Sequence, residues 1–204
     1  AAGFGQLTRR AVRVPVDSTV RVDFQLALAP IAQSVDVTGA AGVVQPASSG
    51  VGVVLDRSRI ETLPLNRRDF LQLALLTPGI EGPVENSELS SRGAIAMHAN
   101  GGREEFNNFL LDGVDNNDVY VNRYVVQPSV DSIQEFKVAT NGYSAEYGRN
   151  AAGQVNVITR SGTSQLRVFG YEYFRDRGLD AANFFEENGK QRFSRNQFGG
   201  GVGG

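Results

Sequence analysis

The stretch SIQEFKVATNGYSAEYGRNAAGQVNVITRSGT, residues 132–163, carries the strand and turn pattern from which the fold of the chain is inferred. Apolar residues alternate around Phe136 and Val138 and again from Gln154 to Thr159, a period of two that is typical of β-strands. Glycine turns follow, at Tyr147-Gly148 between the two runs and at Arg160-Ser161-Gly162 after them. The stretch therefore predicts two strands separated by a tight turn.

A second polar stretch, NNFLLDGVDNND, covers residues 107–118 and holds three aspartates and four asparagines. One interpretation is a calcium loop, with oxygen ligands from Asp112, Asp115, Asn117 and Asp118. The spacing does not fit an EF-hand, because the glycine follows the first aspartate directly. A hydrolase site with two carboxylates is a second interpretation, supported only by the presence of acids. The preferred interpretation is a strand, Phe106–Leu111, closed by an Asp112-Gly113 turn and followed by a polar loop.

Helix signals lie upstream of this region. Asp56 is placed to cap a helix over 57–62, which Pro64 ends. Asn66 is placed to cap a second helix over 67–76, with Asp69 in its first turn. Apolar residues cover most of the circumference of this second helix, so the sequence predicts that it is buried.

The N-terminal part alternates from Val12 to Leu28, which predicts a β-hairpin from a sandwich. A stretch rich in small residues follows over 34–50, and it predicts a linker with one extended piece at 34–38. Near the other end, residues 165–176 alternate with aromatics on one face and glycine and a charge on the other. That pattern is typical of a membrane barrel strand, although an ordinary half-buried strand gives it more often.

The amino-acid composition excludes several classes of function. The formal net charge of −2 gives the chain no overall attraction to nucleic acid, although residues 81–146 hold eleven acidic and four basic residues. The absence of cysteine excludes disulfides and thiolate metal sites. The single histidine, His98, is interpreted as structural. Because the sequence begins without methionine and ends within the pattern QFGGGVGG, we interpret it as part of a longer protein.

Residues 132–163 resemble the closing segment of the plug domain in TonB-dependent outer-membrane receptors. In that resemblance the structural motif residues are Tyr147, Gly148, Gly153 and Asn156. The motifs NNFLLDGVDNN, YSAEYGR, LDAANFF and RNQFGG are together similar to the Oar-like branch, in which a carboxypeptidase-regulatory-like β-sandwich precedes the plug.

The resemblance implies an α+β fold, with a plug of small mixed β-sheet and short helices. Residues 1–38 would be the last strands of the sandwich, 39–50 a linker, 51–162 the plug, and 163–204 the first strands of a transmembrane barrel whose remainder lies outside this sequence.

The implied function is to gate the energy-coupled uptake of an external substrate, without catalysis and without a cofactor or metal. The implied partners are a TonB-type protein of the inner membrane, the downstream barrel and an unidentified substrate. The implied location is the outer membrane of a Gram-negative-type bacterium, with the plug in the barrel lumen and the N-terminal part in the periplasm.

Two candidate sites follow from the resemblance. The TonB box, an extended segment that adds to an exposed sheet edge, is assigned to Ser34, Val35, Asp36, Val37 and Thr38; the same segment is equally consistent with the last sandwich strand. The substrate-side loop is assigned to Asp115, Asn116, Asn117, Asp118 and Asn122. An extracellular β-rich adhesin or carbohydrate-binding module is the alternative function, and the presence or absence of further aromatic-girdled strands downstream discriminates the two.

Overall fold

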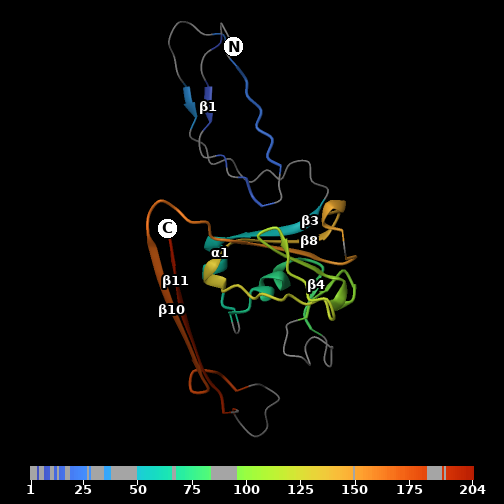
Figure 1. The fold of residues 1–204 in the computed structure, drawn as a ribbon, viewed down its shortest axis with the longest axis vertical. Helices are drawn as coiled ribbons and strands as arrows, with labels where there is room; N and C mark the ends of the chain where they lie inside the picture. The colour runs from blue at the N-terminus through green and yellow to red at the C-terminus, as the bar shows by residue number, and fades with distance from the viewer. Residues whose placement is uncertain are drawn as a thin grey trace. The chain divides into compact units, whose positions relative to one another are not determined.

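A computed structural model describes residues 4, 7–9, 12, 14–16, 19–26, 28, 35–37, 50–65, 68–83, 96–148, 150–182, 190 and 192–204. The chain divides into two compact units, Ala1–Thr159 and Arg160–Gly204 (Figure 1). No helix among the described residues is long and apolar enough to cross a bilayer.

A five-stranded mixed sheet forms the centre of the first unit. Its order is β3 (Val51–Asp56), β8 (Ile133–Asn141), β9 (Gln154–Thr159), β6 (Asn108–Leu111) and β7 (Val114–Asp115). The pairs are antiparallel except for β6 and β9, which are parallel. The two strands expected from residues 132–163 are confirmed, and they are neighbours in the sheet.

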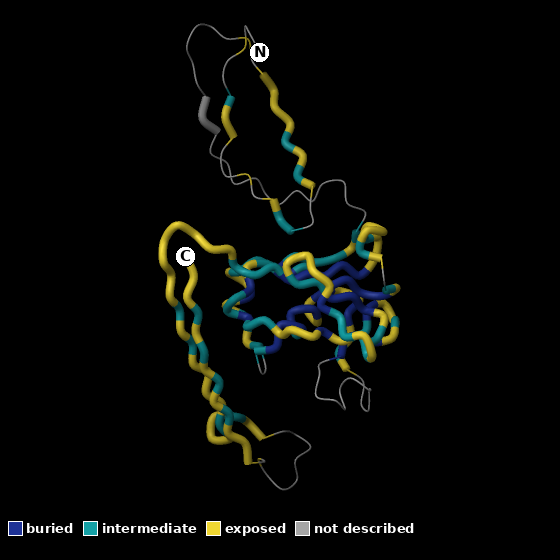
Figure 2. Tube along the Cα trace, viewed as in Figure 1, coloured by how far each residue is buried: buried dark blue, intermediate teal, exposed yellow. Residues whose placement is uncertain are grey.

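The alternation of apolar residues gives the sheet one core face. Two rows of side chains cross four strands in register, Leu55–Phe136–Val157–Leu111 and Val53–Val138–Val155–Phe109. Phe136, Val138 and Val155 have no exposed surface. Figure 2 shows buried backbone concentrated in this sheet and the segments packed on it. The opposite face carries a mixed row, in which the polar Lys137 and Asn156 lie beside the apolar Leu110.

Two short helices follow β3. The first, α1 (Arg57–Thr62), is confirmed: the side chain of Asp56 accepts a hydrogen bond from the backbone N–H of Arg59 at 3.2 Å, and Ile60 is buried against the core. Arg57 and Glu61, one turn apart, form an ion pair on its outer side.

The second helix differs from the prediction. It is a 3-10 helix, η2 (Phe70–Leu76), and Asp69 is its N-cap rather than part of its first turn, accepting from the N–H of Leu71 at 2.9 Å. Asn66 and Arg67, expected to begin the helix, lie outside the described residues. With three residues per turn, Gln72 and Leu75 share an outward face. Leu75 is therefore 38% exposed, and the expectation of burial all round is wrong.

Shorter elements connect these parts. They are β4 (Ile80–Glu81) paired with β5 (His98–Ala99), and the single 3-10 turns η3 (Glu104–Phe106), η4 (Val130–Ser132) and η5 (Ala145–Tyr147). The expected strand Phe106–Leu111 is shorter, because Phe106 belongs to η3.

The N-terminal residues of the first unit form a small strand pair. Strand β1 (Leu7–Arg9) pairs in parallel with β2 (Val35–Val37), and Phe4 bridges Leu28. The hairpin expected over 12–28 is wrong for the residues that the structure describes there, which make only that one bridge. Phe24 and Leu28 are 52% and 77% exposed, so these two side chains of the apolar alternation are not packed in a core.

The second unit is an antiparallel hairpin. Strands β10 (Arg167–Asp176) and β11 (Ser194–Gly203) pair over ten positions each. In Figure 2 its tube shows intermediate and exposed residues and no buried ones. Mixed β-structure with few short helices is thus confirmed for the described chain.

Candidate functional site

The turn after β6 is a two-residue connection of left-handed backbone. Asp112 and Gly113 have φ of 50° and 79°, the combination that joins antiparallel strands in a tight hairpin. The Asp112 carboxylate accepts hydrogen bonds from the backbone N–H and the hydroxyl of Thr159, both at 2.7 Å. Asp112 therefore fixes the end of β9 to this turn.

Asparagines hold the loop after β7. Asn116 is 7% exposed; its Nδ2 donates to the carbonyl of Val126 at 2.9 Å, and its Oδ1 accepts from the N–H of Val126 at 2.8 Å. Asn117 Nδ2 donates to Asn108 Oδ1 at 2.6 Å, while Asn117 Oδ1 accepts from the N–H of Phe109 at 3.0 Å. These amides substitute for missing backbone pairs and close residues 116–126 into an ordered loop.

Asp118 and Asn122 complete the loop. The Asp118 carboxylate accepts from the N–H groups of Tyr120 and Val121, each at 3.0 Å. Asn122 has φ of 53° and donates from Nδ2 to the carbonyls of Glu105 and Asn107. The structure thus brings the five predicted substrate-side residues into one loop and bonds their side chains to the chain itself.

The outward surface of this loop is mainly apolar, with Arg123 as its exposed charged residue. Tyr120 is 91% exposed and Val119 is 79% exposed, and Val125 and Val126 are also open. These exposed apolar residues were not predicted from the sequence, because the prediction of the loop rested on its acidic and amide residues. The sequence did contain a signal for them, the apolar pair Val119 and Tyr120 between Asp118 and Asn122. A loop that contacts only solvent does not require apolar side chains.

A buried amide lies beside Gly153, one of the motif residues named from the resemblance. Asn107 has no exposed surface; its Nδ2 donates to the carbonyls of Met97 and Glu104, and its Oδ1 accepts from the N–H of Gly153 at 3.0 Å. A Cβ at Gly153 would lie 3.1 Å from that same Oδ1. Ala99 Cβ and Met97 Cε lie equally close, at 3.0 and 3.1 Å, so a side chain at position 153 would crowd all three neighbours.

The other motif residues line a cavity of mixed polarity. The carbonyl of Tyr147 accepts from Asn108 Nδ2 at 3.1 Å, and the N–H of Gly148 donates to the carbonyl of Ala145 at 3.0 Å, which ends η5. Asn156 lies 7% exposed on β9. A cavity of about 510 Å³ above this face is lined by Asn108, Leu110, Asp115, Glu146, Tyr147 and Asn156.

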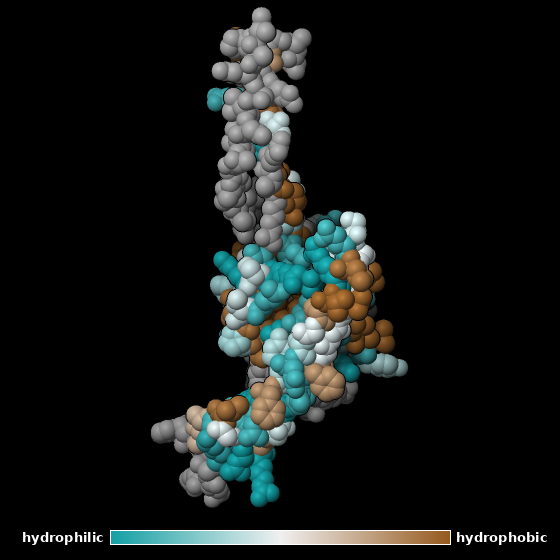
Figure 3. Space-filling model, turned by 90° about the vertical axis from the view of Figure 1, so that its left-hand side faces the viewer, coloured by the Kyte–Doolittle hydropathy of each residue, from teal (hydrophilic) through white to brown (hydrophobic). Residues whose placement is uncertain are grey.

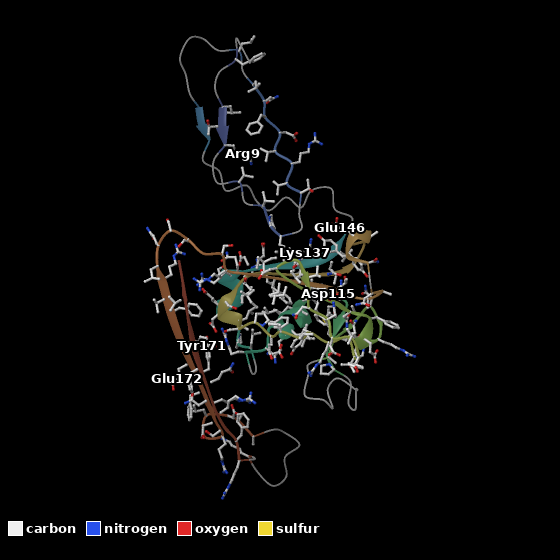
Figure 4. All side chains as sticks on the ribbon, viewed as in Figure 1. Arg9, Asp115, Lys137, Glu146, Tyr171 and Glu172 are labelled. Carbon is white, nitrogen blue, oxygen red and sulfur yellow. The ribbon has the colours of Figure 1, made fainter. Side chains whose placement is uncertain are left out.

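The lining of the cavity combines amides and apolar side chains with three acids, Asp112, Asp115 and Glu146, of which Figure 4 labels the last two. Among the residues that the structure describes, no group of three or more histidine or acidic side chains is placed to hold a metal ion. His98, the single histidine, contacts the carbonyl of Gly102 through Nδ1 at 3.1 Å.

Two contacts anchor the loop to the η2 segment. The hydroxyl of Tyr124 donates to Asp69 Oδ2 at 3.0 Å, and its ring packs 5.0 Å from that of Phe70. Burial, with the adjacent Asp69 carboxylate, raises the pKa of Tyr124 well above its usual value. Arg68, for which the sequence offered no partner, forms an ion pair with Asp131 at 2.9 Å, and both side chains are largely buried.

The TonB-box candidate is only partly described. Val35, Asp36 and Val37 form β2, whereas Ser34 and Thr38 lie outside the described residues. The backbone at Val35–Val37 is extended and pairs with β1 over three residues.

The chain is similar to known outer-membrane proteins. The family described as "Outer membrane beta barrel domain" matches residues 158–204. The chain is 27% identical over 171 residues to the TonB-dependent transporter Oar of Myxococcus xanthus, covering 80% of this chain and 15% of that protein. The chain thus spans about 15% of the length of this curated relative.

Solved structures share the fold. The siderophore receptor PirA from Acinetobacter baumannii superposes with a TM-score of 0.53 at 21% identity, over 74% of this chain and 22% of that one. The outer membrane transporter YddB from Escherichia coli gives a TM-score of 0.50 at 14% identity, over 62% of this chain and 18% of that one.

The resemblance drawn from the sequence is therefore confirmed, and it concerns transporters and receptors, not enzymes. The chain is similar to a TonB-dependent transporter of the Oar type, and its residues 158–204 match an outer-membrane barrel domain, which indicates a location in the outer membrane of a Gram-negative bacterium.

Proposed function

We propose that residues 51–162 are the plug of a TonB-dependent receptor, which closes a barrel and gates the energy-coupled uptake of an external substrate. Residues 1–38 are then the end of a β-sandwich, 39–50 a linker, and 163–204 the start of the barrel. The observation that carries the proposal is the position of one boundary. Strand β9 ends at Thr159, the compact unit ends there, and the match to an outer-membrane barrel domain begins at residue 158.

A deletion tests the plug assignment. Removing residues 51–159 from the intact receptor should leave a barrel without its closure, because the sheet that we assign to the lumen is gone. Cells that carry this variant should become sensitive to bulky hydrophilic antibiotics that intact outer membranes exclude. Unchanged sensitivity, with the shortened barrel present in the outer membrane at the normal amount, would contradict the proposal.

The polar loop is proposed as the part of the plug that faces the substrate. Asp115 to Asp118 and Asn122 shape the loop through inward hydrogen bonds, and Val119 and Tyr120 are the side chains that they present. Siderophores are the substrates named for some fold relatives, and they are one candidate class here.

Two kinds of substitution separate shape from contact in this loop. Tyr120→Ala should leave the fold intact and change uptake of the receptor's substrate, because Tyr120 is 91% exposed. Asn116→Ala should instead loosen the loop, because it leaves the N–H and carbonyl of Val126 without their partner. Normal uptake by both variants in whole cells would remove this loop from the substrate path.

The segment 34–38 is proposed as the TonB box, pulled by a TonB-type protein of the inner membrane. Its extended backbone and its pairing with a single short strand suit addition to a partner's sheet edge. Val37→Pro removes a backbone donor and should abolish energy-coupled uptake. Gln25→Pro, in a described segment outside any strand, is the matched control. Full transport by the Val37→Pro receptor would rule out the box.

A further inference from the structure

The hairpin of the second unit has two faces of different chemistry. One, the aromatic face, carries Phe169, Tyr171 and Tyr173 on β10, since alternate residues of a strand share a side. The other, the acid face, carries Val168, Gly170, Glu172 and Phe174. Figure 4 labels Tyr171 and Glu172, the neighbouring positions that leave the strand on opposite sides.

Charge is placed differently on the two faces. On the aromatic face the charged residues lie only at the strand ends, Arg167 at one end and the directly paired Arg175 and Arg195 at the other. On the acid face Glu172 lies at the middle of the ten-residue strand, where its Oε1 accepts from Asn196 Nδ2 at 3.4 Å.

The aromatic face also covers its own backbone. A Cβ at Gly199 would lie 2.5 Å from Cζ of Tyr171, and one at Gly201 would lie 2.6 Å from Cε1 of Phe169, so both rings lie flat over the opposite strand. The guanidinium of Arg160 lies 5.2 Å from the centre of the Phe169 ring. The result is an uncharged, mainly aromatic surface at mid-strand, which includes the amide of Gln197 opposite Tyr173, with cations toward its ends.

A bilayer distinguishes these two arrangements. A charged side chain is costly at mid-membrane, whereas arginines near the headgroups extend to water and aromatic rings favour that boundary. Strands of ten residues have the length that crosses an outer membrane at the usual tilt. Each face carries one amide, Asn196 on the acid face and Gln197 on the aromatic face, so the amides do not distinguish them. The charge of Glu172 at the middle of β10 does, and it disfavours the acid face for contact with hydrocarbon.

We propose that the aromatic face of β10 and β11 contacts the hydrocarbon of the outer membrane and that the acid face points to the barrel interior. This inference rests on the proposed assignment of residues 163–204 to the start of a barrel. Apolar residues such as Phe198 and Val202, which are open on the acid face, then belong to the interior side (Figure 3 shows apolar residues open on the hairpin surface).

Spin labels in the intact receptor test the orientation. Single cysteines replace residues 169, 171 and 173 of the aromatic face and 168, 170 and 172 of the acid face, and the receptor is placed in phosphatidylcholine vesicles. The unsubstituted receptor, treated with the same label, gives the background. Collisions with oxygen, which concentrates in hydrocarbon, are compared with collisions with a water-soluble nickel chelate.

The proposal predicts an alternating pattern, with an oxygen-to-nickel ratio several-fold higher at 169, 171 and 173 than at 168, 170 and 172. The reverse alternation would overturn the orientation and leave the barrel assignment standing. Equal ratios that favour nickel throughout would show that the hairpin lies outside the membrane, and both assignments would fall. Should Tyr171→Cys fail to assemble, Gln197→Cys and Phe198→Cys make the same comparison on β11.

Discussion

At the scale of single residues, the side-chain amides of this chain stabilise its turns and loops, a role that the sequence pattern alone does not reveal. A run of asparagines and aspartates has the composition of a ligand site. In the structure these side chains replace backbone hydrogen bonds at turns and between segments, with Asn107 fully buried at their centre. Polar residues near a core are stable only when they are bonded, and here the bonds are made within the chain.

The burial of Asn107 gives the first prediction. Asn107→Ala should lower the free energy of unfolding by about 2–4 kcal/mol, because the carbonyls of Met97 and Glu104 and the N–H of Gly153 lose their partner inside the protein. Urea denaturation of the 204-residue chain measures the loss. Gln134→Ala, at an exposed position of β8, is the control and should change stability little. Equal stabilities of the two variants would contradict the role given to Asn107.

The bond between Tyr124 and Asp69 gives a prediction that depends on pH. Tyr124→Phe should cost about 1–3 kcal/mol near neutral pH, because Asp69 loses a buried donor. The folded pKa of Tyr124 is raised, so its contribution is complete below the unfolded pKa of about 10 and is lost as the pH rises above it. Urea unfolding at neutral and alkaline pH should therefore show a smaller alkaline loss in Tyr124→Phe than in the natural chain. An identical alkaline loss in both proteins would sink this assignment.

At the scale of elements, the sequence predicted the features that depend on residues close together along the chain. Alternation predicted β8 and β9, the cap at Asp56 predicted α1, and Asp112-Gly113 predicted the turn before β7. The parallel pairing of β6 with β9 had no such signal, because it joins residues more than forty positions apart. The ion pair of Arg68 with Asp131 was unpredictable for the same reason. At η2 the three-residue period of the 3-10 helix could not be recognised from the sequence, because nearly every position of the segment is apolar.

Two glycines of the first unit separate steric exclusion from backbone strain. Gly52 lies at the irregularity in the β3–β8 pairing, where a Cβ would lie 2.8 Å from the Cα of Ala139. Gly52→Ala should cost more than about 2 kcal/mol and weaken the attachment of β3. Gly113→Ala has open space and a φ of 79°, so it should cost only about 1 kcal/mol.

Hydrogen exchange of the β3 amides distinguishes these two glycine variants. Protection of residues 51–56 should fall in Gly52→Ala and persist in Gly113→Ala. Full protection of β3 in the Gly52→Ala chain would mean that the backbone of β8 moves aside at little cost.

At the scale of the whole molecule, the chain combines a packed sheet with a hairpin that has no core of its own. The sheet buries its apolar rows against α1 and η2, whereas β10 and β11 leave Val168, Phe174 and Phe198 more than half exposed. Exposed strands of this kind need further strands or a bilayer to cover them. Residues 158–204 match an outer-membrane barrel domain, and in such a barrel further strands would close around the face that carries these three residues.

The measurement that tests this account most directly is an immunoblot of fractionated native cells with an antibody against residues 81–159. The account predicts a band several times heavier than the 22.0 kDa of this chain, in the outer-membrane fraction and with a mobility that shifts on heating. A soluble or secreted band near 22.0 kDa would contradict it, because the plug would then have no barrel to close.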